Sequence, residues 1–518
     1  MTDATYTFSI DWDDDGDFGD AGENVSARVL GLRQAVGFRS GRDEARALSA
    51  VAPGETSFEL DNESGDYSPD NPGSPLAGRL TPGKRVLVQA THQGVTRDLF
   101  QGYVDDFELL PDRESRSVKL SVLDMLSKFR EAQPSTALFR SVQTGAAIHA
   151  LLDVMGWPAS LRDIDAGATT IRWWWADGED ALTALAGIVE AEGPPAIAYV
   201  SGSGAFVFRD RHHRLTRPAS TTVQATFRPV GLEPTFASPM TYDIGWRDLV
   251  NQVTVDVEER DPQPTQVVWE TDEIFTLGTG ESRTIVVRTD DPFIDAEAPE
   301  AGTDFTLVSG SVTTTVTRAS GQTTWIEITA SANSVIEGLR LRAKPVTVSR
   351  TLRVEAKDSA SQDVHGVRTL QDAELRFASR NDADAIANVI IGQRAKRLPV
   401  VTITVNSGND TRITQILDRA LSDRIHVVEP EQTFVDHDFF IDQIEHDIAQ
   451  VGLDHRVAFS CERAPESAGA TPNYFTFDSP TADFDNGVFA EAGVSFSSEI
   501  FVLDDPTMGQ LDNRGLGF

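Results

Sequence analysis

The periodicity of the hydrophobic residues changes several times along the chain, and it constrains the possible folds more than any other feature. Up to about residue 130, apolar and polar residues alternate in short runs, as at 56–60 and 117–122. Alternation with a period of two is typical of strands with one buried face. Clusters of turn-forming residues, such as 62–66 and 69–73, separate these runs. The sequence therefore predicts a β domain with long polar loops over residues 1–130.

The spacing of apolar residues becomes helical in the next part of the chain. Between 147 and 155 they recur at intervals of three and four, and a glycine and a proline then stop the pattern. A second helix is expected to begin at Asp177, whose side chain can accept hydrogen bonds from the free N–H groups of the first turn. Two short runs around a turn at 201–204 predict a hairpin. We therefore expect a small α+β domain over residues 131–234.

Residues 263–349 return to a pure strand pattern, with threonine-rich alternation at even spacing. Such spacing is typical of a β-sandwich. The segments on both sides also have the pattern of strands, so we expect this sandwich to be inserted into another domain. That second β domain is predicted to comprise residues 235–262 and 350–462, with a helix at about 381–396.

The last segment, residues 463–518, is both acidic and rich in phenylalanine. From residue 466 onward, nine acidic residues stand against one basic residue, Arg514. The same stretch holds seven phenylalanines, a density that is rare in disordered solvating tails. We expect this extension to dock onto a neighbouring subunit or partner, with folding back onto its own domain as the alternative. The phenylalanines expected to dock are Phe475, Phe477, Phe484, Phe489, Phe501 and Phe518.

The charge of the chain excludes one class of function. Its 518 residues include 45 Lys and Arg against 80 Asp and Glu, a formal net charge of −35. Binding to nucleic-acid phosphates needs clustered basic residues, so no specific nucleic-acid binding is expected.

No run of about 18 apolar residues is present, and we expect no membrane span. The single cysteine, Cys461, leaves no intramolecular disulfide, and the N-terminus lacks a signal-peptide pattern, so we expect a protein made in the cytosol.

An acidic loop after the first predicted strand is the sharpest candidate site. Asp11, Asp13 and Asp15 occupy the first, third and fifth positions of an EF-hand-like loop, and a glycine follows at the sixth. The glutamate expected at the twelfth position comes one place late, as Glu23, so Asp20 or Glu23 could complete the ligand shell. We predict a Ca²⁺ site here, with an acidic but metal-free turn as the alternative.

Catalytic motifs are scarce, and we expect no enzymatic activity. The nine histidines are scattered, and the sequence has neither a His-Glu-x-x-His zinc motif nor a Cys-x-x-Cys pair. The adjacent His212 and His213 are interpreted as part of a solvated loop. The run from Asp436 to Asp438 is interpreted as a turn before a strand, with metal binding as the alternative.

Three consecutive tryptophans, Trp173, Trp174 and Trp175, are a possible exposed aromatic surface. If they lie in a strand, the middle ring points to the opposite face from its neighbours. Packing between domains is the favoured interpretation, and stacking against a ligand is the alternative.

A series of short motifs in a fixed order resembles one family of viral proteins. It covers about residues 1–260 and 350–460. The motifs include Phe58-x-Leu60-Asp61-Asn62-x-x-Gly65-x-Tyr67, Leu99-Phe100-x-Gly102-x-Val104, Leu249-Val250-Asn251-x-Val253, Ser361-x-x-x-His365-Gly366-x-Arg368 and Phe440-x-x-x-x-Ile444-x-His446. Together they resemble the minor tail proteins of long-tailed actinobacterial phages, and among these the tail hub, also called the baseplate hub or tail-associated protein.

The resemblance implies a mainly β, multidomain fold. It comprises two related hub-type β-barrel-like domains, a small α+β domain and the inserted all-β sandwich. It also implies a homotrimer at the tail tip of the virion, made in the host cytoplasm, whose duplicated barrels face the hexameric tail tube. The implied partners are the distal tail protein, the tape measure protein and other tail-tip minor tail proteins.

Two functions are therefore expected. The favoured one is a structural hub that caps the distal tail tube, docks tail-tip proteins and opens for genome ejection, with an acidic lining that repels DNA. The alternative is a host-attachment or adsorption module, in which the inserted domain binds cell-wall carbohydrate.

Overall fold

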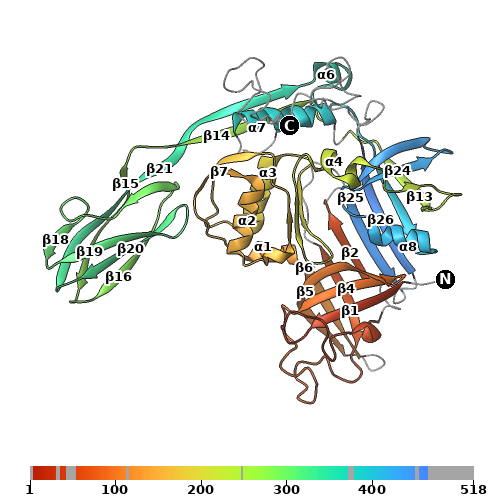
Figure 1. The fold of residues 1–518 in the computed structure, drawn as a ribbon, viewed down its shortest axis with the longest axis horizontal. Coiled ribbons are helices and arrows are strands. Elements are labelled where there is room, and N and C mark those ends of the chain that lie inside the picture. The colour runs from red at the N-terminus through yellow and green to blue at the C-terminus, as the bar shows by residue number, and fades with distance from the viewer. Residues whose placement is uncertain are drawn as a thin grey trace, which may run out of the picture.

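The computed structural model describes residues 4–30, 36–42, 54–111, 116–246, 249–371, 379–449 and 454–464. Over these residues the chain builds several sheets, with a few helices packed beside them (Figure 1). The predicted fold class, mainly β and multidomain, is confirmed. Among the described helices, none is long and apolar enough to cross a membrane.

The N-terminal sheet has five antiparallel strands in the order β1-β4-β5-β6-β3. Buried and less buried residues alternate along β4, where Val86, Val88 and Ala90 are all buried. This is the period of two that the sequence predicts. The elements are β1 (Thr5–Asp11), η1 (Ser26–Arg28), β3 (Glu55–Asp61), β4 (Arg85–His92), β5 (Val95–Pro111) and β6 (Arg116–Asp124).

The second sheet has seven strands, six of them in the order β12-β24-β25-β26-β23-β13. The seventh, β2, pairs with β25 beyond the end of β24, so β2 and β24 share one edge of β25. The elements are β2 (Val36–Gly41), β12 (Thr226–Phe227), β13 (Ala237–Asp243), β23 (Val400–Asn406), α8 (Asp410–Asp418), β24 (Arg424–Glu429), β25 (Val435–Ala449) and β26 (Asp454–Arg463).

The two sheets repeat one four-strand arrangement. In the first, β4, β5 and β6 form an antiparallel meander, and the preceding strand β3 pairs with β6. In the second, β24, β25 and β26 form the meander, and the preceding strand β23 pairs with β26. The loop at 62–84 connects β3 to β4 in the first sheet, and the segment that contains helix α8 connects β23 to β24 in the second. The middle strand of each meander contains a register shift, so the chain carries two copies of one topology.

One hydrophobic core joins the two sheets. Phe8 of the first sheet and Phe459 of the second both belong to it. Strand β2 ties the sheets together, because its Phe38 stacks on His446 of β25 with 4.7 Å between the ring centroids. We expected residues 1–130 to form a separate domain. The structure differs because β2 leaves the N-terminal part of the chain and pairs in the second sheet.

The α+β unit has a hydrophobic core of its own. Helix α3 begins at Ala181, where Asp180 caps it by accepting a hydrogen bond from the N–H of Thr183. The sequence suggested Asp177 as the cap, but that carboxylate accepts a hydrogen bond from Thr323 of the inserted domain instead. The elements are η2 (Met125–Ser127), α1 (Lys128–Glu131), β7 (Phe139–Gln143), α2 (Thr144–Val154), η3 (Ala159–Leu161), β8 (Arg162–Ile164), β9 (Thr170–Trp174), α3 (Ala181–Glu192), β10 (Ile197–Val200), β11 (Phe206–Arg209), α4 (His213–Thr216) and α5 (Pro218–Thr221).

A long antiparallel ribbon of β14 and β21 carries the inserted domain. Helix α7 packs on this ribbon and forms a third core with it. We assigned β14 to the second β domain. It pairs instead with β21 along its whole length and with β22 over residues 252–254. The elements are β14 (Gln252–Pro262), β21 (Ser334–Lys357), α6 (Ser359–His365), β22 (Thr369–Gln371) and α7 (Arg380–Arg394).

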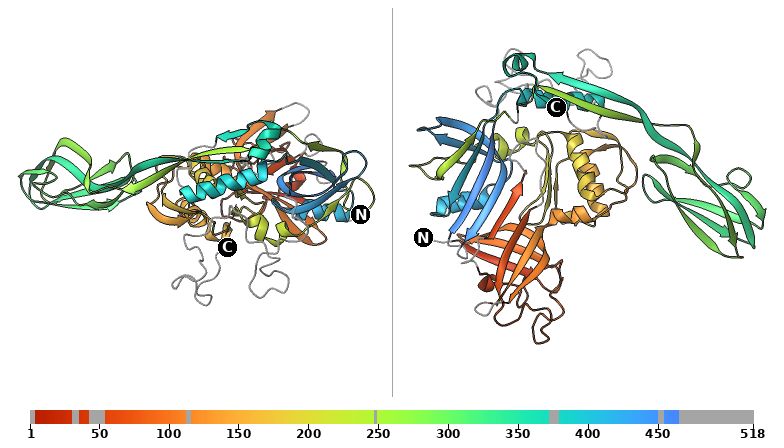
Figure 2. Two further views of the ribbon diagram at one scale, coloured as in Figure 1. Left: turned by 90° about the horizontal axis from the view of Figure 1, so that it is seen from above. Right: turned by 180° about the vertical axis from the view of Figure 1, so that it is seen from behind.

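The inserted domain consists of two facing groups of strands at the end of the ribbon. One group is β15, β17 and β18 paired with β21, and the other is the sheet β16-β20-β19. Phe275, Ile326 and Ile336 belong to the core between them. Figure 2 shows the domain extending away from the rest of the chain along the ribbon. Its other strands are β15 (Gln266–Leu277), β16 (Ser282–Arg288), β17 (Phe293–Glu297), β18 (Thr306–Ser309), β19 (Val312–Arg318) and β20 (Thr323–Ala330).

Candidate functional site

The candidate metal site is the acidic loop after β1. Asp11 is fully buried, and its carboxylate accepts hydrogen bonds from the backbone N–H groups of Asp14 (2.7 Å) and Gly16 (3.1 Å). Both of these residues have left-handed backbone, with φ of 63° and 95°, which lets the loop turn back on Asp11. Carboxylate oxygens of Asp11, Asp13 and Asp15 lie within 4.8 Å of one another. The structure thus brings together the three residues predicted as the first ligands.

The other two predicted ligands, Asp20 and Glu23, come from the end of the same loop. Glu23 is buried, and its carboxylate accepts hydrogen bonds from the N–H groups of Asp20 (2.9 Å) and Trp12 (3.3 Å). Burial raises the pKa of Glu23. The negative charges of Asp13 and Asp15 raise the pKa of Asp20. The loop therefore concentrates carboxylates whose charged forms a bound cation would stabilise.

Two basic side chains balance part of this charge. The Nζ atom of Lys84 lies 2.5 Å from a carboxylate oxygen of Asp14, and Nη1 of Arg79 lies 3.4 Å from Oδ2 of Asp13. The other oxygen of Asp13 is buried and has no hydrogen-bond partner among the described residues. Ca²⁺ takes six to eight oxygen ligands, so Asp11, Asp13 and Asp15 could hold it, with Asp20 next to them.

The three consecutive tryptophans do not form an exposed aromatic surface. Trp173 and Trp174 are 5% and 0% exposed. Trp174 packs on Phe139 within the α+β core, with 5.6 Å between the ring centroids. Trp175 donates a hydrogen bond from Nε1 to Oε1 of Gln322 in the inserted domain (3.2 Å). Trp174 is buried because it fills the α+β core, whereas Trp175 is half-buried at the contact with the inserted domain.

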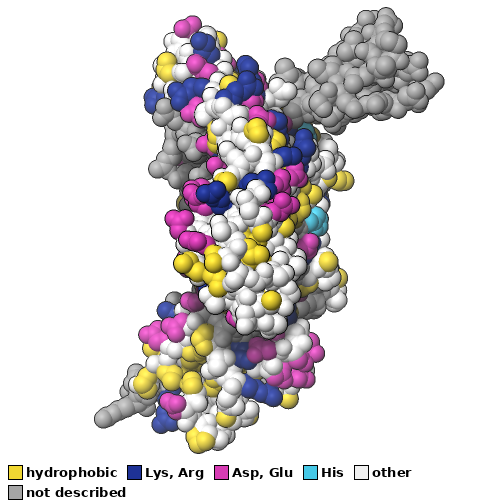
Figure 3. Space-filling view, turned by 90° about the vertical axis from the view of Figure 1, so that its left-hand side faces the viewer, with side chains coloured by type: hydrophobic (Ala, Val, Ile, Leu, Met, Phe, Trp, Pro, Cys, Tyr) yellow, Lys and Arg dark blue, Asp and Glu magenta, His cyan; other side chains and the backbone are white. Residues whose placement is uncertain are grey.

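Two other tryptophans are exposed, and the sequence patterns did not single them out. Trp246, which follows β13, and Trp325 of β20 are each 48% exposed. Trp325 lies opposite the exposed Val286 in the outer sheet of the inserted domain. Figure 3 shows the molecule from the end that carries the inserted domain, where both hydrophobic and charged side chains reach the surface. A lone aromatic residue in a strand pattern does not reveal which face meets solvent.

A buried ionic cluster joins three parts of the chain. Asp442 of β25 is fully buried, and its Oδ1 lies 3.2 Å from Nε of Arg42 and 2.5 Å from Nη2 of Arg214. Arg42 follows β2, and Arg214 belongs to α4 of the α+β unit. The guanidinium of Arg42 also donates to the carbonyl oxygens of Pro195 (2.7 Å) and Ala196 (3.0 Å). Burial lowers the pKa of Arg42 to about 10, so the cluster depends on Asp442 for its charge balance.

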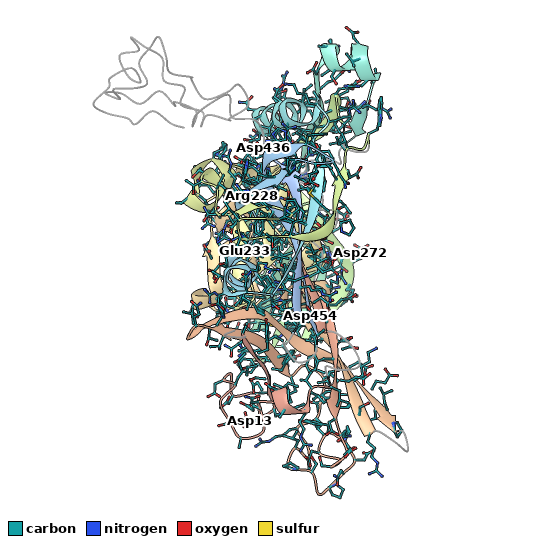
Figure 4. The ribbon with its side chains drawn as sticks, turned by 90° about the vertical axis from the view of Figure 1, so that its right-hand side faces the viewer. Asp13, Arg228, Glu233, Asp272, Asp436 and Asp454 are labelled. Atoms are coloured by element: carbon teal, nitrogen blue, oxygen red, sulfur yellow. The ribbon has the colours of Figure 1, made fainter. Side chains whose placement is uncertain are left out.

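The run from Asp436 to Asp438 lies within β25 and is not a turn, because these residues pair with β24. His426 of β24 lies between the two carboxylates, 2.8 Å from Asp436 and 2.6 Å from Asp438. Burial alone would raise the pKa of Asp438. The hydrogen bonds from His426 and Arg424 have the larger effect together, so the pKa of Asp438 is lowered. In Figure 4, Asp436 lies toward the opposite end of the molecule from Asp13, so these two acidic groups are separate.

The polar residues of the sequence motifs hold turns and junctions. Asn251 is fully buried, and its side-chain amide donates to the carbonyl of Gly366 (2.8 Å) while its Oδ1 accepts from the N–H of Arg368 (2.7 Å). Two motifs that are distant in sequence therefore meet at this residue. Asn62 similarly accepts from the N–H of Tyr67 (2.9 Å) and fixes the loop between β3 and β4.

The phenylalanines expected to dock onto a partner lie outside the described residues, as does the rest of the extension after Ala464.

No family model matches the sequence, and no curated protein matches it. Solved structures that align with the chain include a 43 kDa prophage tail protein from Shewanella oneidensis, with 11% identity, 88% of this chain and 98% of that chain covered, and a TM-score of 0.45. A tail protein from Neisseria meningitidis aligns with 11% identity, 89% and 96% coverage, and a TM-score of 0.48. A prophage tail protein from Listeria monocytogenes aligns with 8% identity, 88% and 94% coverage, and a TM-score of 0.39.

Proposed function

We propose that this chain is a structural protein of a phage tail, a trimeric hub that caps the distal end of the tail tube. The observation that carries the proposal is the repeated four-strand arrangement of β3 to β6 and β23 to β26. This repeat agrees with the pair of related β domains that the sequence resemblance implies. Three chains would present six such units, which is the number needed to match a hexameric tube.

The shared core supports the role of a rigid connector. The two copies are held together by one hydrophobic core, by β2 and by the ionic cluster at Asp442. A connector that transmits force needs its repeated units fixed relative to one another. The proposed partners are the distal tail protein above the hub, the tape measure protein inside it and other tail-tip proteins below.

A structural role also fits the use of the polar residues. The side chains of Asn62 and Asn251 hydrogen-bond to backbone atoms and to the hydroxyls of nearby serines, and these bonds hold turns and junctions. The net charge of −35 would let the channel of such a hub repel DNA and ease its exit during genome ejection.

We propose in addition that the loop at 11–23 binds Ca²⁺ through Asp11, Asp13 and Asp15. The supporting geometry is that their carboxylate oxygens lie within 4.8 Å of one another, and that one buried oxygen of Asp13 has no hydrogen-bond partner in the part of the chain that the structure describes. A cation there would neutralise carboxylates whose mutual repulsion now raises the pKa of Asp20.

Electron microscopy of antibody-labelled virions tests the proposed position. Antibodies raised against this chain should label the distal end of the tail in the phage that encodes it. Label along the tail shaft, on the head or on no part of the virion would contradict the hub. Strong labelling of separate fibres would favour the adsorption module.

A further inference from the structure

A cluster of basic and aromatic side chains surrounds the exposed Trp246. The guanidinium carbon of Arg368 lies 4.9 Å from the centroid of the Trp246 ring, and that of Arg397 lies 5.7 Å from it. The ring of His365 meets Trp246 edge-on at 5.6 Å. We call Trp246, His365, Arg368 and Arg397 the Trp246 patch. In a chain with a net charge of −35, this patch is a local concentration of positive charge around an accessible ring.

Backbone hydrogen bonds fix the patch where three segments meet. Just before β14, the N–H of Val250 donates to the carbonyl of Arg394 (3.1 Å), the last residue of α7. The next N–H, that of Asn251, donates to the carbonyl of Arg368 (3.0 Å). The patch is therefore preorganised and needs no ligand to bring its residues together.

The chemistry of the patch selects an acidic and apolar partner. Arg350 and Arg353 of the neighbouring ribbon each pair with a carboxylate. Within the described residues, by contrast, Arg368 and Arg397 contact the Trp246 ring and form no ion pair. Val364 and Val367, which flank His365 in sequence, are 73% and 61% exposed. Among the residues that the structure describes, the patch thus offers positive charge without a carboxylate partner, together with apolar surface.

The C-terminal extension begins close to this patch. The N–H of Ala464 donates to the carbonyl of Asp438 (2.9 Å), and the N–H of Arg463 donates to the carbonyl of Pro399 (3.0 Å). Pro399 lies two residues after Arg397 of the patch. A segment tethered this near to a surface has a high effective concentration there, about millimolar for a short flexible link.

We propose that residues 465–518 bind the Trp246 patch of their own chain. This segment has nine acidic residues, one arginine and seven phenylalanines. Its carboxylates complement Arg368 and Arg397, and its phenylalanine rings suit Trp246 and the exposed valines. The proposal does not depend on the tail function, and it fails or succeeds separately from it.

Limited digestion of the full chain by chymotrypsin tests the proposal, since this protease cleaves after phenylalanine. The double variant Arg368→Glu with Arg397→Glu should be cleaved within 465–518 about tenfold faster than the native chain, because it loses the charge and cation–π contacts of docking. The matched control is Arg283→Glu with Arg340→Glu in the inserted domain, which makes the same change in charge and should leave the cleavage rate at the native value.

Equal cleavage rates in the native chain, the patch variant and the control would overturn the proposal. Trp246→Ala provides an independent variant at an exposed position and should also accelerate cleavage. Zero-length cross-linking of Lys396 to carboxylates of the extension then identifies the occupant. With isotopically labelled and unlabelled chains mixed, cross-links within one copy are expected. Cross-links that join two copies would overturn binding to the same chain and assign the extension to a neighbouring subunit.

Discussion

Tyr6, His455 and His446 form a hydrogen-bonded row across the core that the two sheets share. The hydroxyl of Tyr6 lies 2.7 Å from Nδ1 of His455, and Nε2 of His455 lies 3.0 Å from Nδ1 of His446. Burial lowers the pKa of His446 to about 3 and lowers that of His455 well below its ordinary value. Both rings are therefore neutral in the folded chain at pH 7, and their protonation requires the core to open.

The stability of the chain should fall as the pH falls below about 6.5. Histidines of the unfolded chain take up protons near this pH, whereas His446 and His455 in the folded chain do not, so each contributes a loss of about 1.4 kcal/mol per pH unit. Urea unfolding between pH 7.5 and 5.5 measures this slope. His446→Gln should reduce it, and His149→Gln, at an exposed position, should not. An identical midpoint at both ends of this range would contradict the buried neutral row.

Loss of the buried carboxylate at the three-way junction should be costly. Asp442→Asn leaves Arg42 and Arg214 buried without their shared counter-charge, and we expect the free energy of unfolding to fall by about 3–5 kcal/mol. The matched control is Asp454→Asn, which removes half of an exposed pair with Arg456 and should cost at most about 1 kcal/mol. Chemical denaturation of both variants gives the comparison. Equal losses would show that the junction does not depend on Asp442.

At the scale of elements, the strands, helices and turns that depend on a local sequence pattern could be predicted from the sequence. The alternation in β4, the helix α7 and the hairpin of β10 and β11 follow directly from hydrophobic spacing and turn residues. The convergence of Asp11, Asp13 and Asp15 could also be predicted, because one loop contains all three.

Other features depend on contacts between distant parts of the chain, which spacing does not reveal. Helix α8 has only nine residues, too few for a clear helical period. The run at 436–438 looks like a turn because it is charged, yet it lies in β25, where His426 and Arg424 of the neighbouring strand hydrogen-bond to its carboxylates. The pairing of β2 with β25 joins residues about 400 positions apart.

The acidic loop gives a prediction at the same scale. Calorimetric titration of Ca²⁺ into chelator-treated protein should show binding, because the cation replaces repulsion among the carboxylates with coordination. Asp13→Ala with Asp15→Ala should abolish the binding heat. The control Asp272→Ala with Glu273→Ala removes two exposed carboxylates from β15 and should leave it intact. Absence of heat in the native chain, or equal heat in the loop variant, would contradict a calcium site.

At the scale of the whole molecule, the duplicated topology and the net charge are the features that a tail hub would use. The two copies of the four-strand unit face one core, and the inserted domain extends away from them on the β14–β21 ribbon (Figure 2). This arrangement separates a compact connector from a projecting domain. In the proposed hub, the connector would meet the tube and the projecting domain would contact other proteins of the tip.

The mass of the purified chain in solution, measured by light scattering, tests the central claim most directly. Two repeated units per chain match a hexameric tube only if three chains assemble. We predict a stable particle of three times the chain mass of 56.4 kDa. The particle should keep this mass on dilution through the micromolar range. A monomer over the whole range, or a stable dimer, would contradict the trimeric hub.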